Sequence, residues 1–175
     1  VEAAQKLQTF KRSTDAITGV AFGSEADKFI VSSNDGKLTV WQRQGTPGPV
    51  TVVDAHGGSI FAVQRVPGRD AVASMGADRV VRLSRLESLN SIRSYRGSQA
   101  TLTALEVSSD GRTVAAAGAD GQLRLWSTAS SRLIRSIKAH AGAVTALGFA
   151  PSGDVIVSAD ASGEVPPHKK GCIDS

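Results

Sequence analysis

The sequence repeats with a period of about 42 residues, and this repeat restricts the fold more than any other feature. Three segments align on it: SSNDGKLTVW (32–41), MGADRVVRLS (75–84) and AGADGQLRLW (117–126). Their aspartates, Asp35, Asp78 and Asp120, lie 43 and 42 residues apart. Six residues after these aspartates stand Trp41, Ser84 and Trp126, respectively. Such a chain is expected to fold as a row of similar units.

A second marker keeps the same spacing. His56 lies 22 residues before Asp78, and steps of 42 residues lead from it to Ser98 and His140. The surrounding segments are alike: AHGGSIFAV, RGSQATLTAL and AHAGAVTALGF. Two sets of residues with different chemistry therefore follow one period.

Each repeat contains four short runs that are rich in β-branched or small apolar residues, without helical spacing. We predict first strands at 17–22, 102–107 and 143–149, and second strands at 29–33, 70–75, 113–118 and 154–159. Third strands are predicted at 37–41, 79–84 and 122–126, and fourth strands at 49–53, 90–96 and 132–138. Asp-Gly pairs at 35–36 and 120–121 favour tight hairpins between second and third strands. No helix is predicted.

These features resemble the WD40 repeat family, over about residues 7–165. The resemblance depends on the period and on His56, His140, Asp35, Asp78, Asp120, Trp41 and Trp126. The chain departs from the family pattern in having Ala-His for Gly-His, and no Trp followed by Asp. The resemblance implies an all-β, WD40-type β-propeller arc: three full four-stranded blades, an outer strand at 7–11 and a partial fourth blade. The remaining blades of a ring are expected from a longer parent protein, another chain or a second copy of this one.

The pattern is predicted to stop after Val165. In the repeat register Pro166, Pro167 and His168 fall on Arg124, Leu125 and Trp126. Because proline donates no ladder hydrogen bond, the third strand of the fourth blade should end after one or two residues. We therefore divide the chain into an N-terminal extension (1–6), WD40 repeats (7–165) and an aberrant or disordered tail (166–175).

His56, Ser74 and Asp78 have the residue types of a catalytic triad. The resemblance implies a structural use instead: a loop His, a second-strand Ser, the hairpin Asp and a third-strand Trp form a hydrogen-bonded chain. The predicted members of this network are His56, Ser74, Asp78, Asp35, Trp41, Asp120, Trp126, His140 and Ser158. In the same register, the Ser position reads Val31, Ser74, Ala116 and Ser158, and the Asp position reads Asp35, Asp78, Asp120 and Ser162.

No catalytic residue, metal ligand set or cofactor is predicted. His168 and Cys172 are too few ligands for a zinc site, and no glycine-rich phosphate loop precedes a helix. Cys172 is the single cysteine, which excludes an internal disulfide and fits an intracellular protein, cytoplasmic or nuclear. No apolar run reaches the ~20 residues of a membrane helix.

Two functions are compatible with these features. The family resemblance implies a non-catalytic scaffold that docks other proteins, with a candidate protein-binding face formed by Asp15, Asn34, Ser59, Arg79 and Gln99. The alternative is a subunit of a ribonucleoprotein assembly, because the net charge is +4 and basic residues recur at matching positions of the fourth strands. This candidate basic rim consists of Arg93, Arg96, Arg135 and Lys138.

Overall fold

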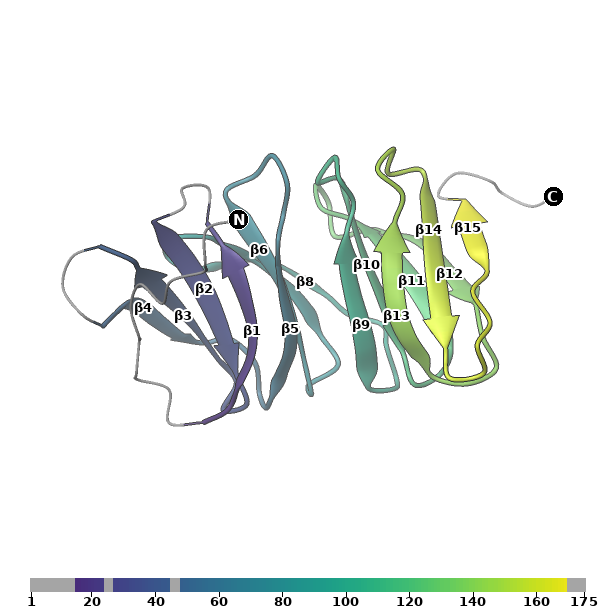
Figure 1. Ribbon diagram of the computed structural model, residues 1–175, viewed down its shortest axis with the longest axis horizontal. Helices are drawn as coiled ribbons and strands as arrows, with labels where there is room; N and C mark the ends of the chain where they lie inside the picture. The colour runs from purple at the N-terminus through teal and green to yellow at the C-terminus, as the bar shows by residue number, and fades with distance from the viewer. Residues whose placement is uncertain (1–14, 24–26, 45–47, 170–175) are drawn as a thin grey trace, which may run out of the picture.

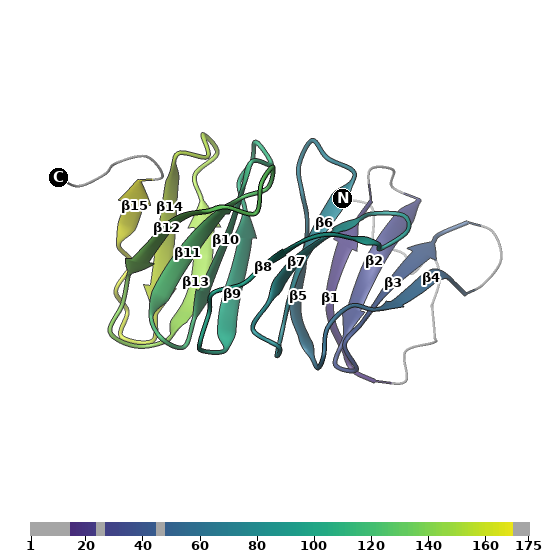
Figure 2. The same cartoon turned by 180° about the vertical axis from the view of Figure 1, so that it is seen from behind.

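The computed structural model describes residues 15–23, 27–44 and 48–169, and these form four antiparallel sheets. The sheets stand one beside the next in chain order, as Figure 1 shows, and Figure 2 shows the same row from behind. The predicted WD40-type arc is confirmed. The described part of the chain is built from strands and turns, and it has no helix that is long and apolar enough to span a membrane.

Each sheet is one blade, and its strands pair in sequence order. Blade 1 contains β1 (Ile17–Phe22), β2 (Lys28–Ser33), β3 (Lys37–Gln42) and β4 (Pro49–Asp54). Blade 2 contains β5 (Ile60–Arg65), β6 (Ala71–Gly76), β7 (Val81–Arg85) and β8 (Ser91–Tyr95). Blade 3 contains β9 (Leu102–Val107), β10 (Thr113–Gly118), β11 (Gln122–Ser127) and β12 (Leu133–Lys138). Blade 4 contains β13 (Val144–Phe149), β14 (Val155–Asp160) and β15 (Pro167–Lys169). The strand predicted at 7–11 lies outside the described residues.

The core is divided among the junctions between neighbouring blades. Three apolar clusters fill the junctions of blades 1 and 2, 2 and 3, and 3 and 4. All six residues of β6 and of β10 are buried, because both strands lie at the centre of their sheets between two other blades. Their small side chains, such as Ala73 and Ala116, let adjacent sheets pack closely.

The third strand of blade 4 extends further than predicted. β15 is three residues long and pairs with β14, with His168 opposite Ile156 and Pro167 opposite Val157. It therefore lies inside the segment that the sequence assigns to an aberrant tail. Pro167 is tolerated because it is the first residue of an edge strand, where no ladder donor is required. His168 holds the position that Trp126 holds in blade 3, so the repeat register continues past Val165.

Candidate protein-binding face

A buried polar chain crosses from the β4–β5 loop into blade 2. His56 Nδ1 lies 2.9 Å from Asp78 Oδ1, and His56 Nε2 lies 2.9 Å from Ser74 Oγ. The His56 side chain has no exposed surface. Gly76 makes this approach feasible, since a Cβ there would lie 2.6 Å from His56 Nδ1. The loop is thus fixed to the blade by two side-chain hydrogen bonds.

Arg82 adds a positive charge to this hydrogen-bonded group of side chains. Its Nη1 donates to Asp78 Oδ2 at 2.6 Å and lies 2.7 Å from His56 Nδ1. Because Nδ1 cannot donate to the carboxylate and accept from Arg82 at once, we assign its proton to the bond with Asp78. Burial raises the pKa of Asp78, but hydrogen bonds from His56 and Arg82 outweigh it and lower that pKa to about 2. Burial lowers the pKa of His56, so at neutral pH a neutral imidazole meets an ionised carboxylate.

Blade 4 contains a similar chain with a different acid. His140 Nε2 lies 2.8 Å from Ser158 Oγ, and Ser158 Oγ lies 3.0 Å from His168 Nε2. The sequence register places Ser162 at the acid position, but the structure brings Asp160 to His140, with 3.2 Å between Oδ2 and Nδ1. Asp160 is the last residue of β14, where blades 2 and 3 have glycines, and Ser162 donates its hydroxyl to it.

In blades 1 and 3 the hairpin aspartates have other partners. Ser33 Oγ donates to Asp35 at 2.5 Å, and Arg124 Nη2 donates to Asp120 at 2.7 Å. The hydrogen bond from Ser33 lowers the pKa of Asp35. For Asp120, burial raises the pKa, but the bonds from Arg124 and the backbone outweigh it and the net shift is downward. The loop before blade 3 offers Ser98 instead of a histidine, and Ser98 Oγ donates to its own loop at Ala100 O.

The two tryptophans differ from the predicted network. Trp41 Nε1 donates to Thr39 Oγ1 at 2.9 Å, within the same strand. Trp126 packs in the apolar cluster against Tyr95, with 5.9 Å between ring centroids. The physical reason is that Val31 and Ala116 occupy the second-strand positions and carry no hydroxyl.

The polar chains are not accessible to a substrate. Ser74 and Ser158 are each 1% exposed, so neither hydroxyl can reach a scissile bond from outside. Among the described residues no group of three or more His, Cys, Asp or Glu side chains is arranged to hold a metal ion. Cys172 lies outside the described residues.

The candidate face falls into two groups. Asp15 precedes β1, and Asn34 N donates to the adjacent Ala16 O at 2.9 Å. In the second group, Arg79 Nη1 donates to Gln99 O at 3.0 Å, and Ser59 O accepts from Ala77 N at 2.8 Å in the β6–β7 hairpin that also contains Arg79. Arg79 and Gln99 are exposed, and Ser59 is half-buried. The structure thus places Ser59, Arg79 and Gln99 together at the end of the blades that carries the β2–β3, β6–β7 and β10–β11 hairpins. We call this end of the blades the hairpin edge.

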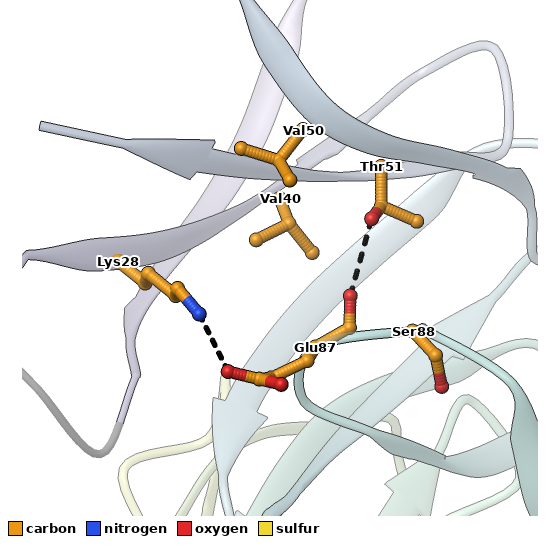
Figure 3. Close-up of a pocket in the computed structure, with 6 residues that line it drawn as sticks. All are labelled: Lys28, Val40, Val50, Thr51, Glu87 and Ser88. Atoms are coloured by element: carbon orange, nitrogen blue, oxygen red, sulfur yellow. Dashed lines mark hydrogen bonds and ion pairs between the residues drawn. The ribbon is translucent and has the colours of Figure 1, made fainter. Parts of the chain in front are cut away.

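The basic rim makes bonds between blades. Arg93 Nη2 donates to Ala129 O at 2.6 Å, and Arg135 Nη1 donates to Lys169 O at 3.1 Å. Thr51, at the matching position of β4, donates to Glu87 O at 3.2 Å (Figure 3). One position of the fourth strand therefore ties each blade to the next. Of the other rim residues, Lys138 Nζ donates to Asp120 O at 2.6 Å, and Arg96 is exposed.

A small cavity of about 340 Å³ lies between blades 1 and 2. Figure 3 shows its lining: Lys28, Val40, Val50, Thr51, Glu87 and Ser88. The Lys28 ammonium pairs with the Glu87 carboxylate at 2.5 Å across it. The repeat pattern does not predict this cavity, because its walls come from strands and a loop of two different blades.

Four packed antiparallel sheets with repeated polar chains define a β-propeller repeat protein. The family model "WD domain, G-beta repeat" matches residues 4–42, and the model "Anaphase-promoting complex subunit 4 WD40 domain" matches residues 63–152. The chain belongs to the WD40 repeat family. No curated protein matches it.

Two designed proteins of known structure have a similar fold. The computationally designed Ika4 protein is 27% identical with a TM-score of 0.84, and the match covers 97% of this chain and 100% of Ika4. The computationally designed Ika8 protein is also 27% identical with a TM-score of 0.83, but the match covers 96% of this chain and only 50% of Ika8. The chain therefore spans half the length of Ika8.

Proposed function

We propose that this chain is part of a non-catalytic WD40 scaffold that docks another protein on its hairpin edge, within a multiprotein complex. The observation that carries the proposal is the group of exposed Arg79 and Gln99 and half-buried Ser59 on a frame of buried, hydrogen-bonded loops. A rigid frame lowers the entropy lost when a partner binds to the loops that it holds. The matched model named for an anaphase-promoting complex subunit supports a role inside an assembly.

The absence of an accessible nucleophile in these polar chains supports a non-catalytic role. Each Ser–His pair is buried, and each pair holds a loop to a blade. Hydrogen-bonded side chains of this kind stabilise a structure because buried polar groups need partners.

RNA binding along the basic rim is the competing proposal. Arg93, Arg135 and Lys138 already donate to backbone carbonyls, which uses part of their capacity for phosphate. An RNA-binding rim would make association strongly salt-dependent, because phosphate contacts release counterions.

The test is affinity purification of the tagged chain from cells, followed by quantitative mass spectrometry with and without ribonuclease. The face variant carries Ser59→Glu, Arg79→Glu and Gln99→Glu, and the matched control reverses the charge at Arg93, Arg96, Arg135 and Lys138. Protein partners that survive ribonuclease and are lost only with the face variant support docking. Partners lost with ribonuclease or with the rim variant refute it in favour of RNA binding.

A further inference from the structure

The β6–β7 hairpin holds an arginine in a backbone conformation that suits glycine. Arg79 has φ 62°, in the left-handed region, whereas the matching hairpin residues Gly36 and Gly121 have φ 80° and 69°. A residue with a Cβ is strained in that region. Leu89 and Ser131, in the β7–β8 and β11–β12 turns, also have positive φ (54° and 57°), so the strain by itself assigns no function. Glycine serves this turn in two other blades, so the backbone itself does not require arginine.

The arginine also changes the loop beside it. Gly36 O accepts from Ala55 N and His56 N at 2.9 and 3.0 Å, and Gly121 O accepts from Ala139 N and His140 N at 3.0 and 3.2 Å. A Cβ at either glycine would lie 2.4 or 2.1 Å from the carbonyl oxygen of that histidine. Within the described residues the β8–β9 loop makes no such backbone bonds to Arg79. That loop is held instead by the Arg79 side chain at Gln99 O.

Arg79 differs from its neighbours in charge pairing. Lys37 pairs with Asp35, Arg82 with Asp78 and Arg124 with Asp120, each on or next to a hairpin. No acidic side chain of the described residues pairs with Arg79, which is exposed. One of its five N–H groups is used at Gln99 O, so its planar fork can still receive a carboxylate.

We propose that Arg79 binds a single Glu or Asp side chain of a partner protein. This inference depends on the proposed docking function and names the chemistry of its partner. The aspartates on the same edge already have cationic partners, because Asp35 and Asp54 pair with Lys37 and Asp120 pairs with Arg124. None of them competes for Arg79. The planar fork of one arginine matches one Glu or Asp side chain in charge and in geometry.

The test is fluorescence anisotropy with the 175-residue chain and two labelled, capped peptides. One peptide carries a single glutamate between Gly and Ser residues, and the other carries glutamine in its place. We expect the glutamate peptide to bind about two- to fivefold more tightly, because the glutamine peptide lacks the charge-assisted bond and an exposed ion pair contributes only modestly. Arg79→Asn should remove this preference, since Asn tolerates the left-handed backbone but has no charge. Arg79→Lys should retain part of it.

Arg112→Asn is the matched control. Arg112 is an exposed arginine in the β9–β10 turn, at the end of the strands opposite to the β6–β7 hairpin. It should leave both affinities unchanged. Equal affinities for the two peptides, no binding of either, or an undiminished preference in Arg79→Asn would overturn the inference. Tighter binding of a ten-residue oligouridine than of the glutamate peptide would also overturn it. If the peptides give one of these results but the cellular partners are still lost with the face variant, protein docking is supported. Only the assignment of a carboxylate to Arg79 is then refuted.

Discussion

Asp78 should contribute more to the stability of blade 2 through its charge than through its shape. Asp78→Asn keeps the size of the side chain but removes the ionised partner of His56 and Arg82. Arg82 is only 19% exposed on its side chain, so its positive charge would lose a close partner at 2.6 Å. Hydrogen bonds to charged groups are worth more than neutral ones, and removing one partner leaves the other partly desolvated.

The pKa of Asp78 sets the magnitude of this contribution. Its lowering from 3.8 to about 2 is equivalent to ~2.4 kcal/mol, at about 1.36 kcal/mol for each pH unit. The carboxylate is 18% exposed, and solvent screening reduces the value, so we expect a loss of ~1–2 kcal/mol at pH 7. A carboxyl with a lowered folded pKa stabilises the fold fully above about pH 4. This stabilisation is lost as the pH falls from about 4 towards 2.

Urea unfolding at pH 7, 5 and 3 provides the measurement, with Asp54→Asn as the control at an exposed aspartate. The free energy of unfolding of Asp78→Asn should lie below the wild-type value by ~1–2 kcal/mol at pH 7. The difference should shrink at pH 3, while the control should stay within about 0.5 kcal/mol throughout. A difference of similar size at pH 7 and pH 3 would refute the argument, because the cost would then come from shape and not from charge.

Three further substitutions test the other polar chains. Asp120→Ala should lower the free energy of unfolding by roughly 1–3 kcal/mol in urea, since Arg124 is 8% exposed and would lose its carboxylate partner; a change below a few tenths would contradict this. Ser74→Ala should reduce stability slightly and leave partner binding intact, and detection of wild-type esterase turnover that this variant lacks would show a catalytic Ser74. Burial lowers the pKa of His168, so its contribution should be full above about pH 6.5 and fall in more acidic solution. His168→Gln should weaken that pH dependence in amide exchange of β15, and identical pH profiles would exclude the role.

The repeat period predicted the bounds of every described strand except β5 and β15. Each strand with predicted bounds begins and ends within two residues of them. β15 lies beyond Val165, where the pattern was predicted to stop. This accuracy has a physical basis, because each blade must bury the same faces against its neighbours and therefore repeats the same alternation of residues. The hairpins at 35–36 and 120–121 were predictable for the same reason, since Gly36 and Gly121 take positive φ.

The partners of individual side chains were less predictable. Counting residues assigns the acid position of blade 4 to Ser162, but a carboxylate two positions earlier, at Asp160, lies nearer His140. A sequence register gives the position along a strand and not the reach of a side chain. Arg82 and Arg124 carried a usable signal, because both stand four residues after a hairpin aspartate, 42 residues apart. The bond from Arg79 to Gln99 O had no such signal in the sequence, since it joins two loops of different blades.

β15 shows why alternation of apolar residues underestimates how far a blade extends. Of its three residues, Pro167 and Lys169 are exposed and His168 is half-buried, so apolar burial contributes little to holding the strand. It is held by its ladder with β14, by His168 at Ser158 Oγ and by Arg135 of blade 3 at Lys169 O. The bond from Arg135 repeats those that Thr51 and Arg93 make to the next blade. An outer strand can thus be positioned by polar contacts from its own blade and the preceding one. These contacts follow the repeat period even where the hydrophobic pattern has ended.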